Sequence, residues 1–126
     1  MRRHTKEADT LKAVMQYLAS RHILAFRMQS GALVNPRGRP VRFGTPGMAD
    51  VLCFTKRIID EFRGHPCGAA QVPWRQVVVQ DPLWLELKSS IGKQSLEQKQ
   101  FQQLVEERGH RYLLVRSLND LVKEIG

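Results

Sequence analysis

The most chemically informative stretch of the sequence is WLELK (84–88), in which a glutamate and a lysine lie two positions apart among large apolar residues. Side chains alternate between the two faces of a strand, so Glu86 and Lys88 are expected on one face and the neighbouring leucines on the other. Burying charged groups costs free energy unless they are paired or bound to a ligand. The stretch therefore raises the question of what Glu86 and Lys88 bind.

Two further acidic residues have positions that suit a metal site. Asp50 stands near the start of the apolar run ADVLCF, and Glu7 lies on the first predicted helix. Carboxylates brought together repel one another, and a divalent cation is the usual reason for a protein to assemble them. Oxygen ligands suit Mg²⁺ or Mn²⁺ better than zinc, for which His65 and Cys67 are a lone pair of ligands. Asp50 and Glu7, together with Glu86, therefore indicate a Mg²⁺ or Mn²⁺ site.

Lys88 adds a second component to the predicted site. Residues two apart on a strand face are separated by roughly 7 Å, so Lys88 can reach a water or a phosphate oxygen beside a metal held by Glu86. Hydrolysis of a phosphodiester needs an activated water and positive charge where negative charge develops. A carboxylate and a lysine on one strand, beside a second carboxylate, supply both.

For each of these residues the sequence also permits a purely structural role. Glu86 and Lys88 can form a surface pair on an edge strand, although the flanking leucines argue for burial. Asp50 can cap the turn that follows GTPG, because Asp is common in turns. Gln98 can act only as the third residue of a capping box, and Glu7 can be an ordinary first-turn helix acid.

The elements that must position these residues can be predicted along most of the chain. Apolar residues recur at helical spacing in 6–20, 95–109 and 117–125, with Ser95 and Ser117 as N-caps and Gly109 as a C-terminal stop. Strands are expected at 22–28, 41–43, 49–54, 77–80, 83–88 and 112–116, and a loop or hairpin tip at 29–40. This order predicts one α/β domain over 1–126, a central mixed sheet flanked by helices, with 56–82 as an insertion or loop region.

The charge of the chain points to a polyanionic partner. The formal net charge is +8 at a pI of about 10.1, and residues 1–44 hold nine Lys and Arg against two acids, a balance of +7. Nucleic acid is the natural partner for such a surface. Arg37, Arg39 and Arg42 lie in the turn-rich hairpin region and are expected to contact phosphates, as is Lys93, the alternative being a plain solvated hairpin.

Asp50, the run ELK (86–88) and Gln98 together resemble the PD-(D/E)xK nuclease superfamily. Within it the chain is similar to the VRR-NUC domain family in its short stand-alone form from phages and bacteria. The runs RFGTPGMADVL, WLELKSSIGKQSLEQKQF and GHRYLLVRSLNDL carry the resemblance. The sequence departs from the family pattern in having MAD where many members have PD, and in the long gap between Asp50 and Glu86.

The resemblance implies a restriction-endonuclease-like core and a role for each residue. Asp50, Glu86, the backbone carbonyl of Leu87 and Glu7 would hold the metal ion. Lys88 would orient or activate the attacking water. Gln98 would support the lysine or the scissile phosphate.

The resulting expectation is a Mg²⁺- or Mn²⁺-dependent DNA endonuclease. The resemblance implies a homodimer that cuts branched or junction DNA in the cytoplasm of a bacterial or phage-infected cell. No apolar run approaches the roughly 20 residues of a membrane span. The alternative is a non-catalytic nucleic-acid-binding protein that retains the fold, whereas a helix-turn-helix repressor fits the charge but not the strand content.

Overall fold

The computed structural model describes residues 6–28, 31–63 and 72–126, although some side chains in these ranges are also left undescribed. Within these residues the helices are α1 (Glu7–Ser20), α2 (Leu96–Glu106) and α3 (Leu118–Ile125). The strands are β1 (Leu24–Arg27), β2 (Gly31–Val34), β3 (Pro40–Phe43), β4 (Val51–Arg63), β5 (Val72–Leu87) and β6 (Arg111–Val115). None of the helices in this part of the chain is long and apolar enough to cross a membrane.

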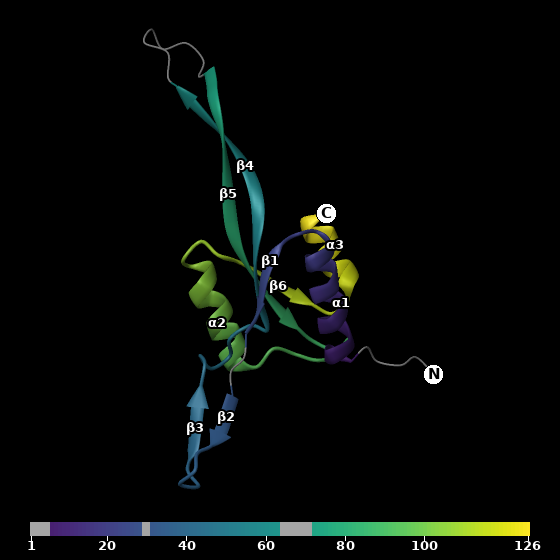
Figure 1. The fold of residues 1–126 in the computed structure, drawn as a ribbon, viewed down its shortest axis with the longest axis vertical. Coiled ribbons are helices and arrows are strands. Elements are labelled where there is room, and N and C mark those ends of the chain that lie inside the picture. The colour runs from purple at the N-terminus through teal and green to yellow at the C-terminus, as the bar shows by residue number, and fades with distance from the viewer. Residues whose placement is uncertain (1–5, 29–30, 64–71) are drawn as a thin grey trace, which may run out of the picture.

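A mixed sheet lies at the centre of the fold, in the order β1-β4-β5-β6. Its first three strands are antiparallel, and β6 pairs in parallel with β5 after the crossover through α2. Helices α1 and α3 cover one face and α2 covers the other (Figure 1). The predicted α/β class, with a mixed sheet flanked by helices, is confirmed.

The alternation of WLELK determines which face of β5 each helix covers. Leu83, Leu85 and Leu87 are fully or almost fully buried in the core that α1 and α3 form with the sheet. Trp84, on the opposite face, packs edge-on against Phe101 of α2, with ring centroids 5.0 Å apart. The predicted two faces of this strand are therefore correct, and Glu86 lies on the α2 side.

The region 56–82, predicted as an insertion or loop region with a strand at 77–80, is mostly strand, and the strand at 77–80 is confirmed. Strands β4 and β5 continue through most of it as one antiparallel ribbon, and Arg57 pairs with Val79 and Arg63 with Val72 in the register. In Figure 1 this ribbon projects beyond the helices as an arm. QDP is typical of a break, but Pro82 lies just before Leu83, where pairing with β6 begins, and proline is tolerated where a strand has an open side. Residues 64–71 and 29–30 lie outside the described residues.

A second, smaller projection is the hairpin of β2 and β3, at the opposite end of the molecule from the arm (Figure 1). The return strand at 41–43 agrees with the prediction. Of the two alternatives for 29–40, a loop or a hairpin tip, the structure shows a hairpin, whose first strand β2 was not predicted. Asn35 organises the turn, because its Oδ1 accepts the backbone N–H of Arg37 at 3.0 Å and that of Arg39 at 2.9 Å. Gly38 supplies the positive φ of 79° that this turn needs.

The turn before β4 docks directly on the start of α2. Gly47 has a φ of 74°, and a Cβ atom built there would lie 2.3 Å from the carbonyl carbon of Glu97 and 2.7 Å from the backbone nitrogen of Gln98. Only glycine allows this approach, because both the backbone conformation and the space exclude a side chain. Gly47 therefore sets the distance between the segment that carries Asp50 and the helix that carries Gln98.

We expect Gly47→Ala to lower the free energy of unfolding by clearly more than the roughly 1 kcal/mol that a positive φ alone costs. The matched control is Gly109→Ala, since Gly109 also has a positive φ but its Cβ would meet nothing within 4 Å. Urea unfolding of the two variants measures the difference. Equal decreases for both would show that the close approach to α2 contributes nothing.

Candidate metal centre

Glu86 is the most deeply buried charged side chain of the described residues, with 2% of its surface exposed. It lies near the end of β5, which at this point has β4 on one side and β6 on the other. The alternative of a surface pair on an edge strand is therefore wrong. A carboxylate in this position needs compensation for its lost hydration.

Asp50, the residue just before β4, lies close to Glu86. Its Oδ2 accepts the backbone N–H of Leu87 at 2.7 Å, and its own N–H donates to the carbonyl oxygen of Leu85 at 3.0 Å. These bonds join residues far apart in sequence, so the carboxylate does more than cap its own turn. Asp50 is held against β5 on either side of Glu86.

Gln98 connects α2 to the site and also takes part in the cap at the start of the helix. Its side-chain oxygen accepts the backbone N–H of Ser95 at 2.8 Å, which completes the predicted capping box. Its Nε2 donates to Oε1 of Glu86 at 2.9 Å. The capping role thus fixes the rotamer that places the amide on the buried carboxylate, and both roles hold at once.

Lys88 follows Glu86 on the same strand face, at the point where β5 ends. Its Nζ lies 3.9 Å from Oε1 of Glu86, and its side chain is 14% exposed. The segment that follows is held by Arg116, whose guanidinium donates to the carbonyl oxygens of Ser89 at 2.8 Å and Gly92 at 2.5 Å. Because the Lys88 side chain is partly exposed, its ammonium group lies at the edge of the site with access to solvent.

The second oxygen of Glu86 is unsatisfied. Oε2 is buried and has no hydrogen-bond partner among the described residues. Burial raises the pKa of Glu86 most, the negative charge of Asp50 raises it further, and Lys88 opposes them, so that the pKa is about 8. A proton shared with Asp50 and the charge of Glu7 act in the same upward direction. A proton or a cation is needed to neutralise this carboxylate.

Not all of the predicted site residues meet. Asp50, Glu86, Lys88 and Gln98 come together, with the backbone of Leu87 bonded to Asp50. Glu7 is the exposed first residue of α1 and acts on Glu86 only through its charge.

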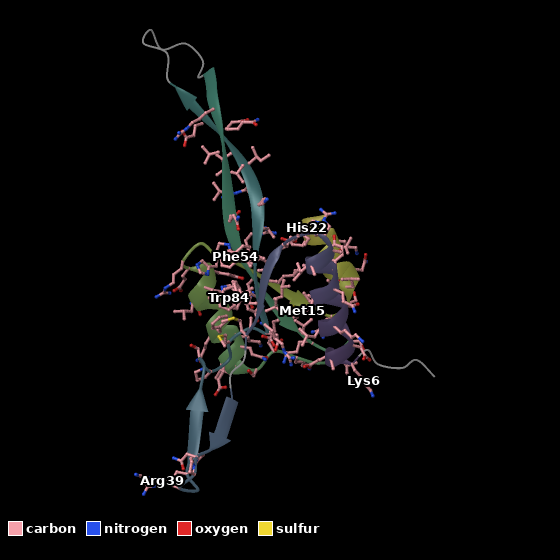
Figure 2. The ribbon with its side chains drawn as sticks, viewed as in Figure 1. Lys6, Met15, His22, Arg39, Phe54 and Trp84 are labelled. Carbon is pink, nitrogen blue, oxygen red and sulfur yellow. The ribbon has the colours of Figure 1, made fainter. Side chains whose placement is uncertain are left out.

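Of the predicted nucleic-acid contacts, those at the tip of the β2–β3 hairpin lie away from the four residues that meet. Arg37 and Arg39 are exposed in the β2–β3 hairpin, whose tip Figure 2 marks with Arg39. Arg42 is on β3, and its side chain is outside the described part. Lys93 is exposed in the segment between β5 and α2.

Two polar residues that support the site were not predicted from the sequence. Tyr112 lies on β6 opposite Trp84, and its pKa is raised by burial and by the nearby charges of Glu86 and Asp50. Gln94 donates to the hydroxyl oxygen of Tyr112 at 3.1 Å. Alternation along β6 could have placed Tyr112 on this face, but only the parallel register brings it opposite Trp84, where the charge of Glu86 acts on it.

The donor atoms present fit a hard cation with several water ligands. Among the described residues no three His, Cys, Asp or Glu side chains are grouped to hold a metal ion. Two carboxylates do approach, and Mg²⁺ is usually held by one or two carboxylates and keeps several waters. The orphaned Oε2 of Glu86 is the atom that a cation would satisfy. His65 and Cys67, the possible zinc ligands, lie outside the described residues.

Comparisons of the chain with protein-family models, with curated proteins and with solved structures find no match.

The raised pKa of Glu86 predicts a pH-dependent stability for the metal-free protein. The folded pKa of about 8 lies above the ordinary value of 4.5, so the folded state holds a proton that the unfolded state loses. The contribution of Glu86 to stability is then fully present below about pH 4.5 and is lost as the pH rises to about 8, with a slope approaching 1.4 kcal/mol per pH unit. Urea unfolding in the presence of a chelator should show this decline.

Glu86→Gln should remove that decline, because the amide does not titrate. Glu61→Gln is the matched control, since Glu61 is a surface glutamate whose pKa is lowered by a hydrogen bond from Arg75. The control should keep the decline of the wild-type chain. A wild-type chain whose stability does not change over this range would contradict the assigned environment of Glu86.

Proposed function

We propose that the chain is a Mg²⁺- or Mn²⁺-dependent DNA endonuclease with a PD-(D/E)xK-type core of the VRR-NUC kind. The observation that carries the proposal is the buried Glu86 carboxylate, which has an unsatisfied Oε2 and lies beside Asp50 and Lys88. The sheet order, with the acidic residue at the start of β4 and the ELK run at the end of β5, agrees with this interpretation.

Each residue of the site has a chemical role in this proposal. Asp50, Glu86 and the Leu87 carbonyl would hold the cation, which when bound lowers the pKa of a water and neutralises phosphate oxygens. Lys88 would orient the attacking water and stabilise negative charge developing on the phosphate. Gln98 holds the Glu86 carboxylate in place through its amide.

The basic first third of the chain would bind the DNA backbone. The β2–β3 hairpin extends from the end of the sheet where Asp50 lies, because Met28 just before it donates to the carbonyl oxygen of Asp50 at 2.7 Å. Arg37 and Arg39 are exposed on this hairpin and form no ion pair within the described residues. A hairpin that carries such cations and extends from this end of the sheet suits contacts to DNA phosphates at a distance from the candidate metal centre.

The proposal includes a branched or junction DNA substrate, a homodimer, and the cytoplasm of a bacterial or phage-infected cell, as the resemblance implies. The second candidate is a non-catalytic nucleic-acid-binding protein with the same fold. The described residues favour the enzyme, because a binding protein has no need of a buried, unsatisfied carboxylate beside a lysine. A cleavage assay with Mg²⁺ and Mn²⁺ on duplex, single-stranded, flap, splayed-arm and four-way-junction DNA separates the two.

Lys88→Ala should separate binding from chemistry. Lys88 cannot itself bind a cation, so its removal should leave Mn²⁺ and DNA binding in place while single-turnover cleavage falls by about 10²–10³. Lys88→Arg should restore little activity, because a planar group replaces a compact charge. Asp50→Asn and Glu86→Gln should abolish cleavage by removing charged ligands.

Lys93→Ala is the matched control for Lys88→Ala, since Lys93 lies in the following segment and is exposed. Lys93→Ala should lower the affinity for DNA but leave the single-turnover cleavage rate unchanged when the enzyme is saturated with DNA and metal. Full-rate cutting by metal-saturated Lys88→Ala protein would make Lys88 a structural partner of Glu86 and overturn the assigned chemistry.

Changing Arg37, Arg39 and Arg42 together to Ala should weaken the salt dependence of duplex binding. For each phosphate that the variant no longer neutralises, the log–log slope falls by about 0.9, because fewer counterions are released. Arg57→Ala is the control, as Arg57 on the arm already pairs with Asp81 at 2.9 Å. An unchanged slope for the triple variant would place the DNA surface elsewhere.

A further inference from the structure

An apolar surface remains uncovered on the α2 side of the sheet. Leu24 and Phe26 of β1 are 56% and 48% exposed. They pair with Phe54 and Leu52 of β4, so the four side chains share one face, and Leu52 is packed in the core on the α2 side. Phe26 and Phe54 lie edge to face with centroids 6.4 Å apart. We define Leu24, Phe26 and Phe54 as the aromatic track.

One end of the track reaches the candidate metal centre. Strand β1 runs towards Asp50, and Met28, two residues beyond Phe26, donates its N–H to the carbonyl oxygen of Asp50 at 2.7 Å. From Leu24 to Met28 the strand covers about 13 Å. A ligand lying along the track would therefore extend directly into the site.

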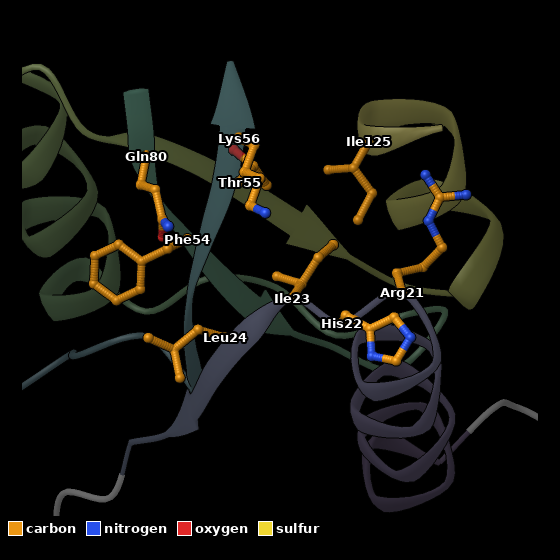
Figure 3. A pocket seen from close by; sticks show the side chains of 9 residues that line it. All are labelled: Arg21, His22, Ile23, Leu24, Phe54, Thr55, Lys56, Gln80 and Ile125. Atoms are coloured by element: carbon orange, nitrogen blue, oxygen red, sulfur yellow. The ribbon is translucent and has the colours of Figure 1, made fainter. Parts of the chain in front are cut away.

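The other end of the track opens into a pocket of about 460 Å³. In Figure 3, Phe54 and Leu24 lie on one side of it, Arg21 and His22 on the opposite side, and Lys56 between them. No acidic residue lines it, and neither Arg21 nor Lys56 is in an ion pair within the described residues.

Arg21 and His22, on one side of this pocket, are positioned by the C-terminal end of α1. The N–H groups of His22 and Ile23 donate to the carbonyl oxygens of Ala19 and Leu18 at 3.0 and 2.9 Å, a Schellman arrangement that accounts for the positive φ of His22. The following residues enter β1 at once. Arg21 and His22 are thus held at the mouth of the pocket by the backbone.

We infer that the aromatic track and its basic pocket bind a single-stranded segment of nucleic acid and lead it to the metal centre. Exposed aromatic rings beside cations are the combination that binds unpaired bases and their phosphates. In a duplex the base faces are already stacked, so the track would select unpaired strands. The inference deepens the proposed function, on which it rests for the step from binding to cleavage.

The charge of this region argues against a second copy of the chain as its occupant. A twofold contact centred on the pocket would bring Arg21 and Lys56 of each copy towards the same unneutralised region of the other, and like charges facing each other across an interface are unfavourable. A strand of phosphates is attracted by the same residues. The observations therefore favour nucleic acid.

The test is fluorescence anisotropy of labelled oligo(dT) and of duplex DNA, measured with a chelator so that no cleavage occurs. Phe26→Ala should weaken oligo(dT) binding by about tenfold, as expected when one base no longer stacks on a ring, and change duplex affinity much less. Phe26→Trp should bind like the wild type. Leu104→Ala is the matched control, because Leu104 is 43% exposed on α2 and lines neither the track nor its pocket, and it should change neither affinity.

Lys56→Ala should reduce the salt slope of oligo(dT) binding by about 0.7, the single-strand value for one neutralised phosphate. Lys123→Ala, an exposed lysine on α3, is its control and should leave the slope unchanged. If Phe26→Ala protein fails to fold by circular dichroism, Leu24→Ala takes its place, since Leu24 is more exposed and contributes less to the core.

Three results would overturn the inference: no oligo(dT) binding by the wild type, unchanged binding after both track and pocket substitutions, or a dimer in sedimentation that Phe26→Ala dissociates. The last result would make the track a protein interface. Cleavage with Mg²⁺ or Mn²⁺, measured separately, tests the proposed function. Oligo(dT) binding through the track without any cleavage would sustain this inference and reject the nuclease. Cleavage by a protein whose oligo(dT) binding is unaffected by the track and pocket substitutions would support the nuclease and reject this inference.

Discussion

The candidate site depends on the cost of burying the Glu86 carboxylate. One of its oxygens accepts from Gln98, and the other has no partner in the described part of the chain. Lys88 compensates only partly at 3.9 Å, and Asp50 adds further negative charge. A fold whose only purpose was stability would have an apolar residue here, since removing a buried charge and replacing it with a well-packed side chain is often stabilising. The presence of this carboxylate is explained if a proton or a cation neutralises its charge and binds its unsatisfied oxygen.

The surrounding structure keeps this costly arrangement in one geometry. Asp50 is tied to the backbone of β5, and Gln98 is locked by its own capping box. The turn at Gly47 brings the two segments that carry them to within backbone contact of each other. Arg116 holds the segment after Lys88. The start of β4, the start of α2 and the segment after β5 are therefore each fixed at this strand end by hydrogen bonds or close backbone contact.

Much of this could be predicted from the sequence, because the relevant patterns are local. Alternation along WLELK places Glu86 and Lys88 opposite the leucines, and Ser95 with Gln98 predicts the start of α2. Apart from the strand at 77–80, the arm was not predicted as strand, and neither was β2. The prolines and glycines near them signal breaks, whereas pairing with a neighbouring strand carries the chain through. The contacts of Tyr112 and Gly47 could not be predicted, because they depend on which strands and helices become neighbours.

The central claim is that a divalent cation neutralises the Glu86 carboxylate. Calorimetric titration of Mn²⁺ into the metal-free protein at pH 7, in two buffers of different ionisation enthalpy, tests it most directly. We expect one ion to bind per chain and to displace nearly one proton, because Glu86 with a pKa of about 8 is mostly protonated at that pH. Glu86→Gln should abolish the binding. An absence of Mn²⁺ binding by the wild type, or equal binding by Glu86→Gln, would contradict the account.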